Sequence, residues 1–69
     1  MESKYIGTDG ICGFKKNHKY EIEINKPKGY CCYNITAFKD ITENLIMEKV
    51  INYASRNSIE RNWEIKVPY

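Results

Sequence analysis

The sequence predicts a small, mostly β domain. The chain has 69 residues, a length that suits one domain with a modest core. Its clearest pattern lies over 19–25, where Tyr20, Ile22 and Ile24 alternate with two glutamates, as in a strand with one buried face. A shorter alternation recurs over 64–67, and glycine, proline and asparagine separate the apolar segments. Alternation of this kind predicts strands and not helices for most of the chain.

Composition excludes several classes of protein. Hydrophobic residues make up 42% and charged residues 29% of the chain, which is typical of a folded chain and not of a disordered one. The net charge is +2, a milder basic excess than nucleic-acid-binding domains usually carry. The longest apolar run, 45–47, is too short to span a membrane, and residues 1–10 lack the apolar stretch of a secretory signal. The three cysteines form an odd set, unlike the disulfide framework of a secreted mini-protein, so we expect a cytoplasmic protein.

The middle of the chain predicts a β-hairpin. The strand over 19–25 is followed by Lys-Pro-Lys-Gly at 26–29, a combination that marks a turn. Residues 30–38 are again rich in tyrosine, isoleucine and threonine, as strands are. On this second strand the better core face carries Cys31, Tyr33, Ile35 and Ala37.

Shorter elements are expected at both ends of the chain. Residues 4–8 predict a first strand, and Asn17 with His18 predicts a tight turn into the strand over 19–25. Residues 64–67 predict a short closing strand with Ile65 and Val67 facing inward.

Before that closing strand, residues 55–62 predict a short helical turn. Ser55 or Ser58 can cap its start. Ile59 and Trp63 are four apart, so they lie on one side of the turn. We expect Trp63 to fill the core and not to serve as a surface contact.

Residues 40–55 fit two structures equally well on local propensity. Asp40 and Glu43 have the spacing of a helical capping box, and a helix over 41–54 would make the domain α+β. As a strand, 45–52 would follow a hairpin tip at 40–44. In that strand one face would carry Leu45, Met47, Ile51 and Tyr53.

The order of these elements is the layout of a known small fold. Four short strands, one short helical turn and a last strand within 1–69 are typical of a single SH3-like barrel of about five strands. Four short sequence motifs resemble those of small uncharacterised proteins of bacteriophages and prophages of Gram-positive bacteria. They lie at 5–7 (Tyr-Ile-Gly), 19–24, 53–55 (Tyr-Ala-Ser) and 59–64.

This resemblance covers most of the chain and implies a phage or prophage origin, without known catalytic residues. It favours the strand over 45–52. The chain departs from the pattern in its longer 40–52 segment and in the Cys31–Cys32 pair.

Catalytic and metal chemistry are weakly supported. Cys12, Cys31, Cys32 and His18 are residue types that bind zinc, but neighbouring cysteines on a strand point to opposite faces, and no Cys-x-x-Cys spacing occurs. His18 is the only histidine, and no nucleophile motif accompanies it. We therefore predict a non-enzyme without metal or cofactor.

Two kinds of binding remain. Residues 1–39 carry seven Lys/Arg and four Asp/Glu, a net +3, whereas 40–69 carry four and five, a net −1. Lysines beside tyrosines could bind single-stranded nucleic acid by stacking and charge, although loop lysines more often serve solubility. The candidate binding residues are Lys15, Lys16, His18, Lys19, Tyr30, Tyr33 and Tyr53.

The leading hypothesis is a non-catalytic module that binds a host or phage protein, for example to inhibit a host defence system. It could also form a homodimer through an edge strand. The nucleic-acid binder is the alternative, and no membrane contact is expected. The core residues expected for either function are Tyr20, Ile22, Ile24, Ile35, Trp63 and Ile65.

Overall fold

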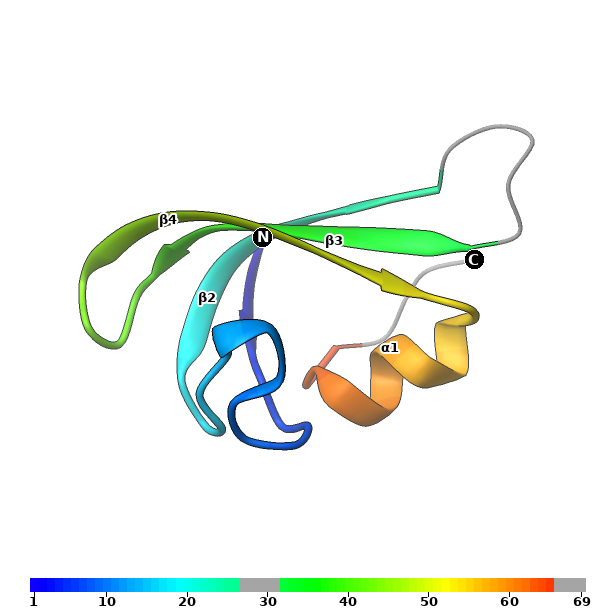
Figure 1. The fold of residues 1–69 in the computed structure, drawn as a ribbon, viewed down its shortest axis with the longest axis horizontal. Coiled ribbons are helices and arrows are strands. Elements are labelled where there is room, and N and C mark those ends of the chain that lie inside the picture. Colours follow the sequence, from blue (N-terminus) through cyan, green and yellow to red (C-terminus); the bar gives the residue numbers. More distant parts are fainter. Residues whose placement is uncertain (27–31, 66–69) are drawn as a thin grey trace.

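Four strands, one 3-10 turn and one short helix make up the described part of the chain. In order, they are β1 (Glu2–Lys4), η1 (Ile11–Gly13), β2 (Lys19–Asn25), β3 (Tyr33–Asp40), β4 (Leu45–Tyr53) and α1 (Arg56–Asn62) (Figure 1). They belong to a computed structural model that describes residues 1–26 and 32–65. The strands form one antiparallel sheet in the order β1-β2-β3-β4. The prediction of a mostly β chain is confirmed.

The β2–β3 hairpin follows the predicted alternation. Tyr20 and Ile22 on β2 are buried, whereas the glutamates between them are exposed. On β3 the buried apolar side chains are Tyr33, Ile35 and Ala37, on the face that the sequence favoured. Strand β3 extends to Asp40, beyond the predicted end. The turn at 27–29, together with Tyr30 and Cys31, lies outside the described residues.

Residues 45–53 form strand β4, so the alternative α+β fold with a helix over 41–54 is wrong. The Asp40 carboxylate does accept a hydrogen bond from the Glu43 N–H, at 3.0 Å, which is half of the contact that a capping box makes. Here that bond closes the turn between β3 and β4. Asn44 completes the turn with a φ of 57°, a left-handed conformation that asparagine tolerates better than most residues.

The helical turn lies where it was predicted. Ser55 caps α1 by accepting a hydrogen bond from the Ser58 N–H at 3.3 Å. Ile59 and Trp63 are both fully buried. Because these two residues share one side of the turn, the helix packs through a single apolar stripe.

The first strand begins earlier than predicted. Strand β1 covers Glu2–Lys4, and residues 6–8 are not part of it. The N–H groups of Ile6 and Gly7 both donate to the carbonyl of Asn62, at 2.8 and 3.1 Å. These bonds draw the chain away from β2 and toward the end of α1.

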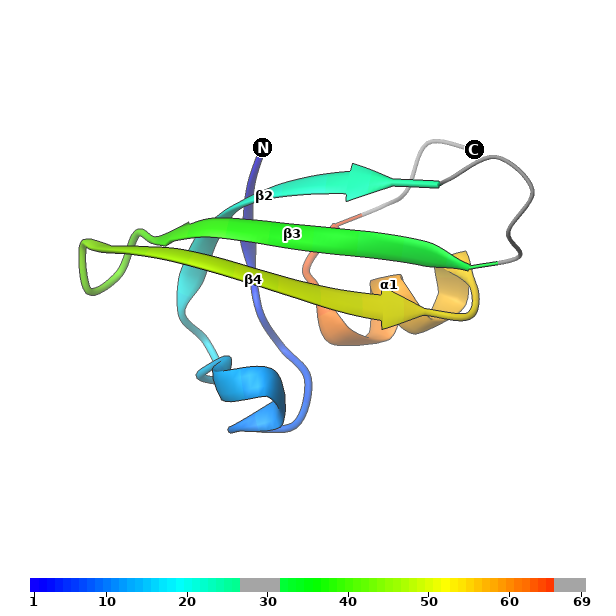
Figure 2. The same cartoon turned by 45° about the horizontal axis from the view of Figure 1, so that its top comes forward.

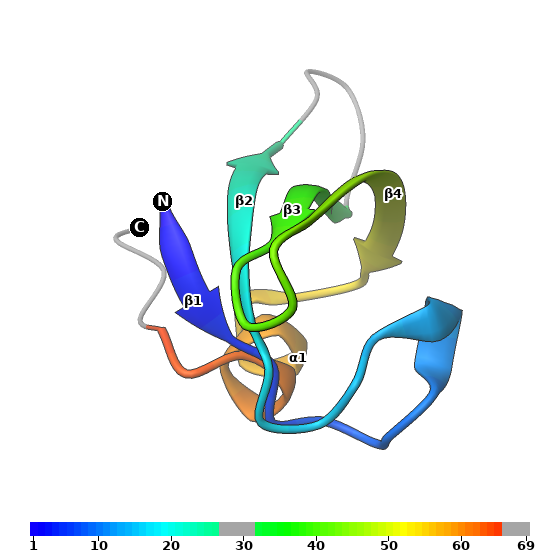
Figure 3. The same ribbon diagram turned by 90° about the vertical axis from the view of Figure 1, so that its left-hand side faces the viewer.

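The five-stranded SH3-like barrel is not confirmed, because the sheet is not closed. Strands β1 to β4 follow one another across Figure 3, with β1 and β4 at opposite edges. After α1 the chain returns to β1 through a single bridge between Tyr5 and Trp63. Glu64 and Ile65 form no strand, and the rest of the predicted closing strand, 66–67, lies outside the described residues.

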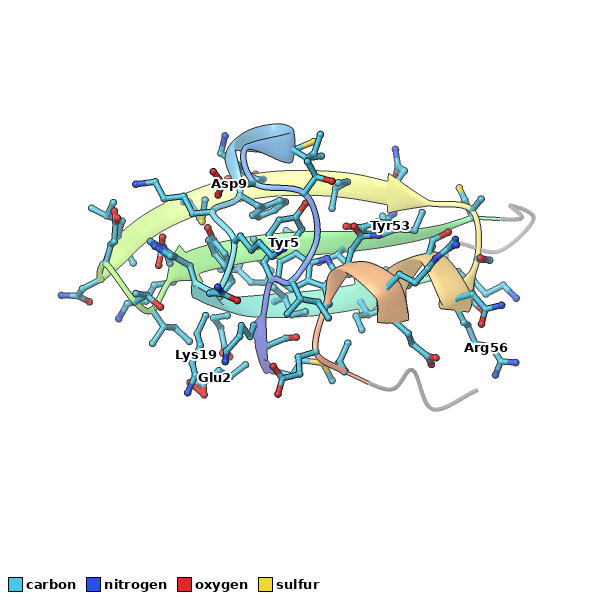
Figure 4. The ribbon with its side chains drawn as sticks, turned by 90° about the horizontal axis from the view of Figure 1, so that it is seen from below. Glu2, Tyr5, Asp9, Lys19, Tyr53 and Arg56 are labelled. Carbon is cyan, nitrogen blue, oxygen red and sulfur yellow. The ribbon has the colours of Figure 1, made fainter. Side chains whose placement is uncertain are left out.

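An aromatic cluster fills the space between the sheet and the segments that cover it. Trp63 contacts Tyr5, Phe14 and Tyr20 edge-on, with ring centroids 5.2 to 5.8 Å apart. Tyr5 and Tyr53 belong to the same buried core, and Figure 4 labels both in a view from below, the side on which α1 lies. The predicted core residues Tyr20, Ile22, Ile35 and Trp63 are buried, and Ile24 and Ile65 pack against the core as partly buried residues.

Candidate functional site

The predicted basic residues are partly neutralised by carboxylates. The Lys15 ammonium lies 2.9 Å from the Glu43 carboxylate, and the His18 Nδ1 lies 3.0 Å from the Asp40 carboxylate. Lys16 has no ion pair within the described residues. The charge that this end of the molecule offers to an anion is therefore smaller than the sequence suggests.

Asp40 is the centre of a polar network at this end of the sheet. Its buried carboxylate accepts hydrogen bonds from the His18 ring and from the Glu43 N–H. Burial by itself raises the pKa of the Asp40 carboxyl, but these hydrogen bonds outweigh burial and leave that pKa below its ordinary value. Because an ionised carboxylate only accepts, the His18 Nδ1 carries the proton of the shared bond. This network connects His18, just before β2, to the turn between β3 and β4, and it therefore stabilises the fold.

The predicted tyrosines do not form a stacking platform beside the candidate lysines, although the Lys26 ammonium lies over the Tyr33 ring, 5.3 Å from its centroid. Tyr33 and Tyr53 face each other across β3 and β4 and are only 8% and 9% exposed. They lie at the opposite end of β3 from Asp40, about 23 Å away at about 3.3 Å per strand residue. Tyr30 lies outside the described residues.

Lys19 pairs with Lys4 across β1 and β2 and does not lie with Lys15. It extends beside Glu2 on the far side of β2 (Figure 4), where both residues line a shallow polar hollow together with Lys4 and Glu64. The structure therefore does not bring the six described candidate binding residues into one groove.

The described cysteines do not belong to a cluster of side chains that could bind a metal ion. Cys12 is exposed in η1, and Cys32 is half-buried just before β3; both are free thiols. Within residues 1–26 and 32–65 no three His, Cys, Asp or Glu side chains come together in a way that could hold a metal ion. Cys31, which was expected to behave as a small buried hydrophobe, lies outside these ranges.

The sheet has one covered and one uncovered face. The segment around η1 and the helix α1 both lie beneath the sheet in Figure 1. When the upper face is turned toward the viewer, as in Figure 2, β2, β3 and β4 lie in front and α1 lies behind them. Among the described residues, no helix or strand packs on this upper face.

Three large apolar side chains gather on the uncovered face of β3 and β4. Phe38 is 42% exposed, Val50 is 56% exposed and Ile46 is 83% exposed. Val50 lies opposite Thr36, and Ile46 lies opposite Lys39. Phe38 lies between these two positions, at an irregularity in the β3–β4 register. We call these three residues the outer patch.

Charged residues of both signs lie within and beside the outer patch: Glu48 lies between Ile46 and Val50 along β4, and Lys39 lies opposite Ile46. Glu23 on β2, Lys39 on β3 and Glu48 on β4 have no ion pair within the described chain. Exposed apolar side chains interspersed with polar and charged ones occur in protein-contact surfaces.

The outer patch is not among the predicted binding residues, although the sequence carries a signal for it. Once 45–53 is a strand, Ile46 and Val50 fall on the face opposite Met47, Ile51 and Tyr53. Apolar residues on both faces of a strand at a sheet edge indicate a second contact surface.

Comparison of the chain with protein-family models, with curated proteins and with solved structures found no match. The described residues contain no helix with the length and apolar character needed to cross a membrane. The structural support for a function is therefore the geometry given above.

Proposed function

We propose that the protein is a non-catalytic binding module that contacts another protein through the outer patch. The observation that carries the proposal is Ile46, which is 83% exposed on the uncovered face of the edge strand β4, close to the β3–β4 turn. A single exposed apolar side chain is ordinary, but Ile46, Phe38 and Val50 lie together. Covering them removes apolar surface from water, which favours association by about 25 cal/mol per Å².

The class of partner follows from the resemblance to phage and prophage proteins. It supports a host or phage protein as the partner, met in the host cytoplasm. Inhibition of a host defence system is one form that such a contact takes. The mixed charges around the outer patch favour a partner with an apolar surface and a polar rim.

Nucleic-acid binding has less support. It needs cationic side chains free to meet phosphates and aromatic rings free to stack on bases. Lys15 and His18 are engaged by carboxylates, and Tyr33 and Tyr53 are buried. We treat this alternative as an outcome that the experiment can produce.

The test compares capture by matched variants. The tagged chain is incubated with a lysate of a Gram-positive host, with and without nuclease, and the retained proteins are quantified. Ile46→Asp should reduce the amount of retained partner at least about tenfold, because it places a charge in an apolar contact. The control Lys16→Glu/Lys19→Glu should retain the partner, with nuclease or without.

The opposite pattern would overturn the proposal. A partner that nuclease removes and that Lys16→Glu/Lys19→Glu loses, while Ile46→Asp keeps it, identifies the nucleic-acid alternative. A protein retained equally by Ile46→Asp and the unmodified chain places the contact on another surface.

A further inference from the structure

The two edge strands of the sheet differ in whether another segment of the chain hydrogen-bonds to their outer backbone groups. At the β1 edge, Tyr5 forms a bridge with Trp63, and the Glu64 N–H donates to the Lys4 carbonyl at 2.9 Å. The chain that follows α1 therefore covers β1. At the β4 edge, no backbone hydrogen bond beyond the pairing with β3 reaches the strand from within the described residues. Strand β4 is nine residues long, and an open edge of this length is a template for another strand.

The alternation of hydrogen bonds across the sheet shows which backbone groups face the open edge. Met1 and Ile22 exchange backbone hydrogen bonds, so the even-numbered residues of β2 face β1 and the odd-numbered ones face β3. The registers of the β2–β3 and β3–β4 pairs carry this alternation across the sheet. On β4, Ile51 therefore faces β3, whereas the N–H and C=O groups of Val50 and Asn52 face outward.

The charges of β4 decide what kind of strand fits this edge. Glu48 and Lys49 are adjacent, so the strand carries no net charge and does not repel a copy of itself. An antiparallel copy centred on Glu48 or on Lys49 would place like charges opposite each other, which is unfavourable. Centring on Val50 or on Ile51 avoids both clashes, and with the Ile51 centre Lys49 lies opposite the second copy's Tyr53. The same centre uses the regular part of β4, past the irregularity in the β3–β4 register.

We propose that the protein forms a homodimer in which β4 pairs antiparallel with β4 of a second copy, centred on Ile51. Val50 of each copy then lies opposite Asn52 of the other, and each pair exchanges both of its N–H···O bonds. The contact is the same surface on both copies, as two-fold symmetry requires. The two sheets become one continuous sheet whose uncovered face carries two outer patches. The inference goes beyond the proposed function and does not depend on a further partner.

Sedimentation equilibrium of the purified full chain tests this proposal, with Val50→Pro and Val50→Thr as the matched variants. Proline removes the outward N–H and is tolerated on an edge strand when that N–H faces solvent. The unmodified chain and Val50→Thr should dimerise with similar dissociation constants. Val50→Pro should raise the dissociation constant at least about tenfold, because each dimer loses hydrogen bonds at both copies. Circular dichroism checks that Val50→Pro stays folded.

A second pair of variants tests the register and covers the case in which Val50→Pro unfolds. Val50→Lys should weaken the dimer, and Val50→Lys/Asn52→Glu should restore it, because the two new charges lie opposite each other only when the pairing is centred on Ile51. A chain that remains monomeric at millimolar concentration overturns the proposal. So does a dimer that these substitutions leave unchanged, since its interface then lies elsewhere. Neither result depends on capture from a lysate, so the proposed function is tested separately.

Discussion

At the scale of single residues, the polar contacts of the core decide which side chains can be replaced. The Trp63 ring N–H donates to the Tyr53 hydroxyl at 2.9 Å, and both groups are buried. Burial raises the pKa of the Tyr53 hydroxyl, and the bond from Trp63 offsets part of that rise. The Tyr5 hydroxyl instead donates to the carbonyl of Thr8, an exposed residue. Both tyrosine rings pack in the core. The Tyr53 hydroxyl accepts a hydrogen bond from a buried donor, whereas the Tyr5 hydroxyl donates to the carbonyl of an exposed residue.

Tyr53→Phe should lower the free energy of unfolding by about 1–3 kcal/mol, because it leaves the buried Trp63 N–H without an acceptor. Tyr5→Phe should lower the free energy of unfolding by less, since water can reach the Thr8 carbonyl that loses its donor. Urea unfolding monitored by Trp63 fluorescence measures both variants. Equal losses in the two variants would contradict this account of the Trp63–Tyr53 bond.

Asp40 predicts a pH dependence of stability. Its pKa in the folded chain lies below its ordinary value, which is about 3.9 for an unperturbed aspartate. A group with a lowered folded pKa contributes stability that is fully present above the unfolded value and is lost as the pH falls through the folded value. Asp40→Asn should therefore be less stable than the unmodified chain near pH 7, and the difference should shrink below about pH 4. Urea midpoints measured from pH 7 to pH 3 test this, and a difference that does not vary with pH would refute it.

At the scale of elements, similar caps serve a helix and a turn. Ser55 caps α1, whereas Asp40, with helix-cap spacing to Glu43, closes the turn before β4. Which of the two structures forms depends on what the following residues can pair with. Residues 45–53 pair with β3 along their length, whereas α1 packs through Ile59 and Trp63.

Ser55→Ala should destabilise the protein by about 1 kcal/mol, the usual value of a serine N-cap. The helix has only seven residues, so it cannot compensate for the lost cap with other turns. Asn57→Ala is the control, because Asn57 is an exposed residue of the first turn that does not cap it. Thermal unfolding compares the two variants. A loss in Asn57→Ala as large as in Ser55→Ala would show that the cap is not the cause.

At the scale of the whole molecule, the described residues cover only one face of the sheet. The segment around η1 and helix α1 supply the cover on the core side (Figure 1), and no described helix or strand packs on the other side. Ile35 and Ile46 show the result: Ile35 is fully buried on the covered face, and Ile46 is 83% exposed on the uncovered one.

These two isoleucines should respond differently to the same substitution. Ile35→Val should lower the free energy of unfolding by about 1 kcal/mol, because it leaves a cavity in the core. Ile46→Val should change it by less than about 0.5 kcal/mol, as expected of an exposed site. Guanidinium unfolding of both variants is the measurement. A similar loss at both positions would mean that the outer patch is covered in the isolated protein.

Some features of this protein could be predicted from the sequence because they depend on neighbours along the chain. The alternation of Tyr20 and Ile22 is enough to define a strand with a buried face, and Ser55 is enough to begin a helical turn. The burial of Trp63 likewise follows from its spacing to Ile59. The candidate binding residues were less predictable. Lys15 and His18 lie 28 and 22 residues from the carboxylates that engage them, and spacing along the chain does not reveal such pairs.

The sequence by itself determined the mostly β character, the two faces of the central strands and the place of the short helix, since each rests on local periodicity. Only the tertiary structure decided between strand and helix for 45–53, left the sheet open and exposed the outer patch. Local preferences for strand and helix are balanced over 45–53, so the hydrogen bonds between β3 and β4 decide for the strand. The chain after α1 meets β1 only through the bridge between Tyr5 and Trp63 in the described residues, which leaves the sheet open.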